Sequence, residues 1–119
     1  MIIKERKARV RRFFDRVVGE GDLAAVDELL GAGCTYRDAG RLSTTGRGEF
    51  ANYLVAARSP FDQIHVEIQD IIAEGDRVAV RCTYHLTVAG EHSTAAVMAV
   101  FRFDQAKIVE MWRTVAAQE

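Results

Sequence analysis

The sequence is short of the residues that mark several common protein classes. Among its 119 residues there are only two cysteines, Cys34 and Cys82, and their spacing fits neither a metal site nor a disulfide framework. It has a single proline, and no apolar run reaches membrane-spanning length. The formal net charge of −1 gives no overall field that favours nucleic acid or an anionic membrane. We therefore expect neither a nucleic acid nor a membrane as a partner.

The N-terminal segment MIIKERKARVRR lacks the apolar core of a signal peptide. A reduced, cytoplasmic protein is therefore the expectation. The basic run in this segment could contact phosphates, but no further basic cluster follows, so a solvated helix face is the favoured interpretation. With 49% apolar and 28% charged residues, the chain is expected to fold as one domain over residues 1–119.

Hydrophobic periodicity predicts helices in the first half of the chain. Apolar residues between positions 10 and 18 recur at helical spacing. Asp22 is placed to cap a second helix, and the segment GAG at 31–33 is expected to end it. A third helix is predicted over about 48–58, ending before Pro60. The segment CTYRDAG (34–40) is interpreted as a polar break between a helix and a loop.

From residue 63 onward the pattern changes to a period of two, which is typical of strands. Glycine-containing or polar segments at 75–76, 89–91 and 104–107 are expected to turn the chain between these strands. Helices followed by an antiparallel meander predict an α+β fold, with the helices on one face of a curved sheet.

The alternation also predicts which side chains face the helices. The apolar set comprises Cys82, Tyr84, Val97, Ala99, Phe101 and Phe103, and on the last strand Val109, Met111 and Val115. Arg113 shares the phase of this last group. An isolated charge on a buried face is costly, so Arg113 needs a partner or a route to solvent. Asp38 is a natural partner, and extension of Arg113 to the open end of the sheet is the alternative. His65 and His85 fall in the opposite phase and are expected to face away.

The order of elements, with AEGDRVAVR and FRFDQAKIVEMW, resembles the nuclear transport factor 2-like superfamily, and within it the SnoaL-like polyketide cyclases and ketosteroid isomerases. The resemblance covers residues 10–115. It implies a cone-shaped fold, in which helices close the concave side of the sheet around an apolar pocket. It also implies pairing of two subunits through the convex side, and apolar Met98, Val100 and Trp112 in the outward phase support such a homodimer.

The resemblance places Asp38 at the position of the ketosteroid isomerases' proton-transferring base. The hydrogen-bond donors that the family supplies for the enolate oxygen correspond here to Phe14 and Ala99, whose side chains cannot donate. Loss of one such donor typically costs roughly 100- to 1000-fold in rate, so steroid isomerisation by that mechanism is disfavoured. The carboxylate that SnoaL-like cyclases carry after the last tryptophan is also missing, because Trp112 is followed by no acidic residue up to Ala116.

Two functions stay open. The first is a cofactor-independent, metal-free isomerase, cyclase or hydrolase that acts on an apolar oxygenated small molecule, with Asp38 as acid/base and Arg113 beside it. The residues expected to bind the substrate are Phe14, Tyr36, Tyr53, Tyr84, Ala99, Phe101 and Met111. The second is a non-catalytic ligand-binding or dimeric association domain of the same fold.

Overall fold

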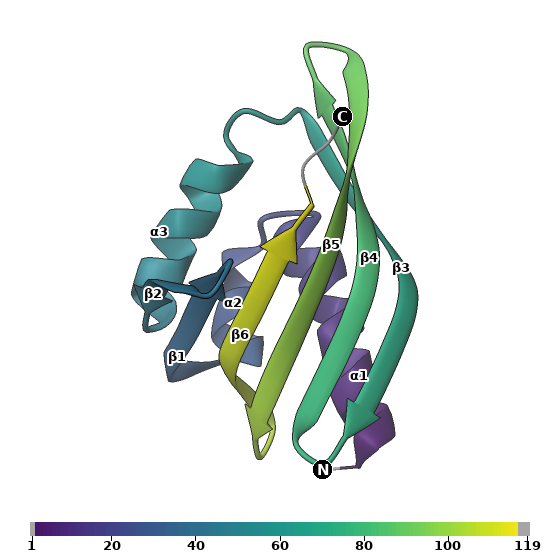
Figure 1. Ribbon diagram of the computed structural model, residues 1–119. Coiled ribbons are helices and arrows are strands. Elements are labelled where there is room, and N and C mark those ends of the chain that lie inside the picture. The colour runs from purple at the N-terminus through teal and green to yellow at the C-terminus, as the bar shows by residue number, and fades with distance from the viewer. Residues whose placement is uncertain (1, 117–119) are drawn as a thin grey trace.

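A computed structural model describes residues 2–116 and has the predicted α+β architecture, with helices gathered on one face of a curved sheet (Figure 1). The first part of the chain comprises α1 (Ile3–Arg12), η1 (Phe13–Val18), α2 (Leu23–Leu29), β1 (Leu30–Asp38), β2 (Arg41–Thr45) and α3 (Arg47–Arg58). The second part comprises β3 (Gln63–Glu74), β4 (Arg77–Val88), β5 (Glu91–Asp104) and β6 (Lys107–Val115). We call the sheet face under the helices the inner face, and the opposite face the outer face.

The strands form one six-stranded sheet in the order β2-β1-β6-β5-β4-β3. The four strands of the second half pair antiparallel with their chain neighbours, as the alternation predicts. The sheet as a whole is mixed rather than purely antiparallel, because β1 pairs parallel with β6. This pairing joins the first and last strands and brings residues near position 36 beside residues near position 111.

The first predicted helix is formed, but its second half is π-helical. α1 continues without a break into η1, where Phe13, Phe14 and Val17 are buried. A π-helical turn is rare and often lies at a functional site. The cap predicted for α2 is confirmed: the Asp22 carboxylate accepts hydrogen bonds from the backbone N–H groups of Ala24 (3.0 Å) and Ala25 (3.3 Å). α3 also begins and ends close to the predicted positions.

The predictions for residues 31–40 were wrong. α2 ends at Leu29, and the glycines at 31 and 33 lie inside β1 rather than at a helix end. Gly31 lies where a Cβ atom would come within 3.1 Å of the Val109 side chain, so it allows a close approach of β1 to β6. CTYRDAG is thus a strand followed by a turn, in which Ala39 (φ 51°) and Gly40 (φ 82°) reverse the chain into β2.

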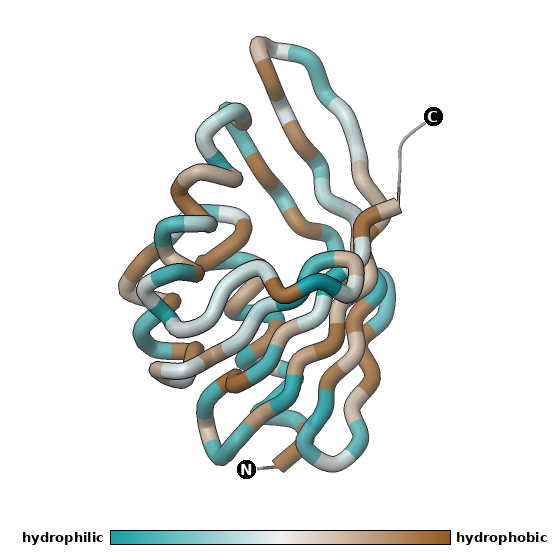
Figure 2. Tube along the Cα trace, turned by 60° about the vertical axis from the view of Figure 1, so that its left-hand side comes forward, coloured by the Kyte–Doolittle hydropathy of each residue, from teal (hydrophilic) through white to brown (hydrophobic). Residues whose placement is uncertain are grey.

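The alternation along β4 and β5 predicts the core correctly. Cys82, Tyr84, Val97, Ala99, Phe101 and Phe103 are all buried, with at most 7% of any of them exposed. Figure 2 shows the corresponding succession of hydrophobic and hydrophilic residues along the long strands. On β6 the prediction for Val109 was wrong: an irregularity between Arg102 and Phe103 shifts the register, so that Ile108 is fully buried and Val109 is only partly buried. A bulge of this kind changes the face to which a side chain points.

Within residues 2–116, no helix is long and apolar enough to span a bilayer.

Candidate functional site

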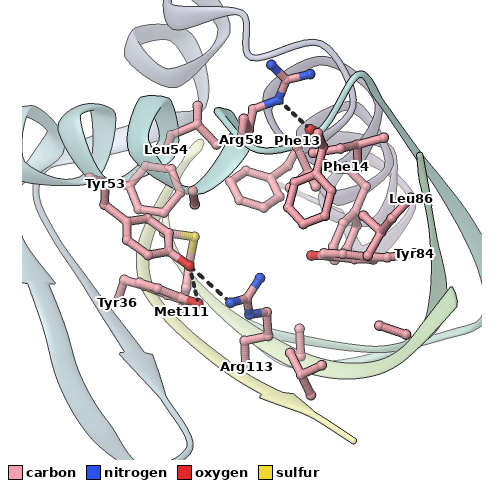
Figure 3. Close-up of a pocket in the computed structure, with 18 of the residues that line it drawn as sticks. Phe13, Phe14, Tyr36, Tyr53, Leu54, Arg58, Tyr84, Leu86, Met111 and Arg113 are labelled. Atoms are coloured by element: carbon pink, nitrogen blue, oxygen red, sulfur yellow. Dashed lines mark hydrogen bonds between the residues drawn. The ribbon is translucent and has the colours of Figure 1, made fainter. Parts of the chain in front are cut away.

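A cavity of about 250 Å³ lies between the helices and the inner face of the sheet. Its walls are aromatic and aliphatic. On the helical side they include Phe13, Phe14, Phe50, Tyr53 and Leu54, and on the strand side Tyr36, Tyr84, Ala99, Phe101 and Met111. Figure 3 shows the labelled members of this set, among them Phe14, Tyr53 and Tyr84, around an open centre. A cavity of this size, with few polar groups, is suited to a small apolar molecule.

Arg113 brings a charge into this apolar cavity. It lies on β6 between Met111 and Val115, and all three line the cavity as the strand phase predicts. Figure 3 shows its guanidinium extending into the centre, between Tyr53 and Tyr84. The Cζ atom lies 5.7 Å from the ring centroid of Tyr36 and 6.0 Å from that of Tyr84, which is within the range of a cation–π contact.

Among the described residues, Arg113 donates its hydrogen bonds through one nitrogen. Nη2 donates to Asp38 Oδ2 at 3.0 Å and to the Tyr53 hydroxyl at 3.0 Å. The Tyr53 hydroxyl lies 3.4 Å from the hydroxyl of Tyr36. A continuous polar chain therefore runs from Asp38 through Arg113 and Tyr53 to Tyr36 along one wall of the cavity.

The surroundings keep Arg113 charged and Tyr36 and Tyr84 neutral. Burial disfavours the cation, but the neighbouring tyrosine oxygens and the hydrogen bond to Asp38 outweigh it and raise the pKa of Arg113 above its ordinary value. Burial raises the pKa of Tyr84 to about 12 and also raises that of Tyr36. At neutral pH Arg113 thus presents a guanidinium to the cavity beside the protonated hydroxyl groups of Tyr36 and Tyr84.

Asp38 lies beside the cavity rather than in its wall. It is the last residue of β1, and Cys34, Tyr36 and Asp38 share one phase of that strand. Cys34 and Tyr36 are buried, whereas the side chain of Asp38 is 38% exposed because the strand ends there. Asp38 is not among the residues that line the cavity. Its link to the cavity is the hydrogen bond that it accepts from Arg113. Its pairing with Arg113, which the sequence left open, is present in the structure.

The structure brings the other sequence-predicted site residues together. Arg113 and all of the expected substrate-binding residues lie in the wall of this one cavity, and their role in binding stays a prediction. The sequence did not predict a place there for Arg58, which lies at the end of α3 and donates hydrogen bonds to the carbonyl oxygens of Val18 (2.9 Å) and Gly19 (2.8 Å). Its position as the last basic residue of α3 could have been read as a helix cap, but nothing in the sequence places it at the cavity.

Neither the cysteines nor the histidines contribute reactive groups to the cavity wall. Burial raises the pKa of the Cys34 thiol to about 12 and that of Cys82 to about 11, so both stay protonated. His65 is exposed on the outer face, and His85 also lies there, with Nε2 2.9 Å from Glu67 Oε1. Among residues 2–116, no group of three or more histidine, cysteine or acidic side chains could hold a metal ion.

The family model of the SnoaL-like domain matches residues 10–111. The chain belongs to the SnoaL-like domain family, within the nuclear transport factor 2-like superfamily. No curated protein sequence matches the chain.

Solved structures of SnoaL-like and related proteins share its fold. A protein assigned as a SnoaL-like polyketide cyclase from Jannaschia sp. CCS1 is 15% identical, with a TM-score of 0.84 over 94% of this chain and 85% of the other. An LEH-like epoxide hydrolase of M. tuberculosis is 23% identical, with a TM-score of 0.81 over 95% and 84%. AclR of Streptomyces galilaeus, assigned as a hydroxylase, is 19% identical, with a TM-score of 0.82 over 97% and 91%. At these identities the likeness shows the fold alone.

Proposed function

We propose that this SnoaL-like domain takes an apolar, oxygen-bearing small molecule into its cavity and promotes an isomerase-, cyclase- or hydrolase-type reaction at that oxygen without a cofactor. The single observation that carries the proposal is the hydrogen-bonded chain Asp38–Arg113–Tyr53 at the wall of an otherwise apolar cavity. Donors fixed in a water-poor site stabilise negative charge that develops on a bound oxygen. Arg113 and the Tyr53 hydroxyl would supply this stabilisation.

In this proposal Asp38 acts together with Arg113. The Asp38 carboxylate accepts a hydrogen bond from Arg113 and does not line the cavity, so it is not placed to remove a proton from a carbon atom of a bound molecule. The partly exposed position of Asp38 gives it access to water, which it could orient towards the bound molecule. Hydration or hydrolysis thus fits the geometry better than direct removal of a carbon-bound proton. The polyketide cyclase and epoxide hydrolase with similar folds are consistent with acid/base chemistry on an apolar substrate.

The second candidate function is ligand binding without turnover. It is favoured by one specific observation: among the described residues that line the cavity there is no aspartate, glutamate or histidine. A wall of this composition lacks an ordinary general base in direct contact with a ligand.

Turnover of a panel of apolar epoxides, lactones and ketones, followed by mass spectrometry of the products, tests the proposal. For an accepted substrate, Asp38→Asn and Arg113→Met should each lower kcat by at least about 100-fold, the usual cost of losing a charge-stabilising group. Asp76→Asn is the matched control, because Asp76 forms an ion pair with Arg77 in an exposed turn away from the cavity. Full turnover by both site variants would contradict the proposed catalytic role of Asp38 and Arg113 and would favour ligand binding without turnover at this cavity.

We further propose that two copies of the chain pair through the outer face. Cross-strand neighbours place apolar side chains together there: Val100 lies opposite Trp112 of β6, and Met98 lies on the same face of β5. Met98 is 63% exposed and Ile72 of β3 is 66% exposed. Large apolar side chains concentrated on one sheet face are typical of a surface that is covered by a partner, and a two-fold pair covers both copies at once.

A further inference from the structure

We propose that the natural ligand of the cavity carries a negatively charged oxygen group, such as a carboxylate, on an apolar body, and that this group lies against Arg113. The inference rests on the proposed function and deepens it by naming the class of ligand. Three observations carry it: the charges in the cavity wall, the unused donors of Arg113 and the position of Asp38.

The charged side chains that line the cavity are both guanidinium groups. Arg58 and Arg113 are in its wall, and no acidic side chain of the described residues is. Arg58 is held at the cavity by two backbone carbonyl oxygens, and no acidic side chain in residues 2–116 forms an ion pair with it. A cavity with low polarity and positive charge in its wall favours an anion over a neutral molecule, and a neutral molecule over a cation.

Arg113 has N–H groups that donate to no described residue. Both of its hydrogen bonds to described residues use Nη2, and none of these residues accepts a hydrogen bond from Nη1 or Nε. The Nε atom is buried as well as unpaired. Buried donors of a charged group are rarely left unpaired, because the lost hydrogen bond with water is costly. An anionic oxygen beside the guanidinium would provide the missing acceptor, and charge-assisted hydrogen bonds are about twice as strong as neutral ones.

Asp38 does not take this place. It contacts Arg113 at one nitrogen from outside the cavity wall, and its side chain is 38% exposed, whereas that of Arg113 is 23% exposed. Water therefore screens the negative charge of Asp38 more than it screens the guanidinium. The side of the guanidinium that faces the cavity remains open to an acceptor, with the Tyr53 hydroxyl as a neighbouring polar group (Figure 3).

Three probes with the same apolar tail and different head groups test the inference by isothermal titration calorimetry. Decanoate is anionic, methyl decanoate is neutral and decyltrimethylammonium is cationic. We expect decanoate to bind roughly tenfold more tightly than the ester, which is the typical difference between a charged and a neutral hydrogen bond. The cation should bind more weakly than the ester.

Variants of the two arginines locate the effect. Arg113→Met should make the affinities for decanoate and its ester equal to within about twofold, while Arg113→Lys, which keeps the charge, should retain a preference for decanoate. Arg58→Gln removes the other guanidinium of the wall and should weaken the preference less than Arg113→Met does, because Arg58 donates its hydrogen bonds to two backbone carbonyl oxygens. The matched control is Arg81→Met, which removes an exposed guanidinium of the outer face and should leave the preference unchanged. If Arg113→Met does not fold, as judged by circular dichroism, Arg113→Gln replaces it.

The outcomes separate this inference from the proposed function. Equal binding of decanoate and methyl decanoate by the unaltered protein would overturn the anionic ligand and leave the apolar cavity as a binding site. A preference that survives Arg113→Met would also overturn it, because the charge would then be recognised elsewhere. Binding of none of the three probes would count against both the inference and the proposed function.

Discussion

Asp38 and Arg113 are register partners on neighbouring parallel strands, and their side chains are joined by a 3.0 Å hydrogen bond. The two residues are 75 positions apart in the sequence. The pairing of β1 with β6 therefore builds the polar end of the cavity directly. A shift of β1 by one residue would turn Asp38 to the outer face and leave Arg113 without its carboxylate.

The first prediction concerns the opposite effects of one substitution on binding and turnover. Asp38→Asn removes the only carboxylate that contacts Arg113 among the described residues, so its negative charge no longer repels an anionic ligand in the cavity. We expect decanoate to bind roughly two- to fivefold more tightly, in line with the modest strength of a partly exposed ion pair, up to about 1 kcal/mol. Turnover of an accepted substrate should fall at the same time. Calorimetry and product analysis measure the two effects on the same preparation.

The control for this variant is Asp76→Asn, which removes an aspartate of a distant exposed ion pair. It should change neither the affinity for decanoate nor the turnover. Weaker binding of decanoate by Asp38→Asn would contradict the prediction, because it would mean that Asp38 is needed to hold Arg113 in place.

The second prediction is that a larger side chain on β5 fills the cavity and blocks ligand binding. Ala99 is the register partner of Arg113, lines the cavity and is 7% exposed. Ala99→Leu should lower the affinity for decanoate by at least about tenfold. The free energy of unfolding should change by less than about 1 kcal/mol, because the added atoms enter existing empty space. Calorimetry and urea unfolding measure the two quantities.

Ala96→Leu is the matched control for this substitution. Ala96 lies three residues earlier on the same strand, in the opposite phase, and is exposed. This variant should bind decanoate like the unaltered protein. If Ala99→Leu also keeps its affinity, the ligand does not occupy the space beside Arg113.

The sequence was sufficient to predict the inner face of β4 and β5 because the side-chain period of a strand is fixed by its geometry. Tyr84, Ala99 and Phe101 were correctly placed by counting alone. The same counting failed for Val109, because an irregularity in the pairing of β5 with β6 reverses which residues of β6 face the core. The residue types around this irregularity do not reveal it. The helices could also be predicted from the sequence, since their apolar spacing and the Asp22 cap are local features.

β1 was not predicted from the sequence. The position of Asp38 at the end of this strand, beside the cavity, was therefore not predicted either. Glycines at 31 and 33 resemble a helix end, whereas in the structure Gly31 serves the close approach of β1 to β6. The partner strand lies at the far end of the chain, and no local pattern encodes a parallel pairing over such a distance. The sequence identified Arg113 as a charged residue on an apolar face. Whether its side chain contacts Asp38 or extends to solvent is decided by the pairing of β1 with β6, which the sequence did not show.

The third prediction concerns the outer face. If two copies pair there, Met98→Glu should place a charge in the interface and convert a dimer into a monomer, because an unpaired charge in an apolar contact is costly. Light scattering coupled to size-exclusion chromatography measures the mass. Val55→Glu is the control, since Val55 is 58% exposed on α3, away from the sheet face. A monomeric mass for the unaltered protein at high concentration would contradict the proposed pair.

The fourth prediction follows from the two buried thiols. Burial raises the pKa of Cys34 from 9.0 to about 12 and that of Cys82 from 9.0 to about 11. The folded protein therefore keeps thiol protons that the unfolded chain releases above about pH 9, so unfolding releases protons and stability falls as pH rises. The thiols' contribution is fully present below about pH 9. Between about pH 9 and 11, each thiol should lower the free energy of unfolding by up to roughly 1.4 kcal/mol per pH unit.

Urea unfolding at a series of pH values measures this slope, and Cys34→Ala with Cys82→Ala isolates the share of the thiols. The double variant is less stable at neutral pH, because each substitution leaves a small gap in the core. Its stability should nevertheless decline less steeply above about pH 9, with the remaining slope coming from Tyr84, whose pKa burial raises from 10.0 to about 12, and from Tyr36, whose pKa burial also raises. Equal slopes for the two proteins would show that the thiols lose their protons as readily in the folded state as in the unfolded one.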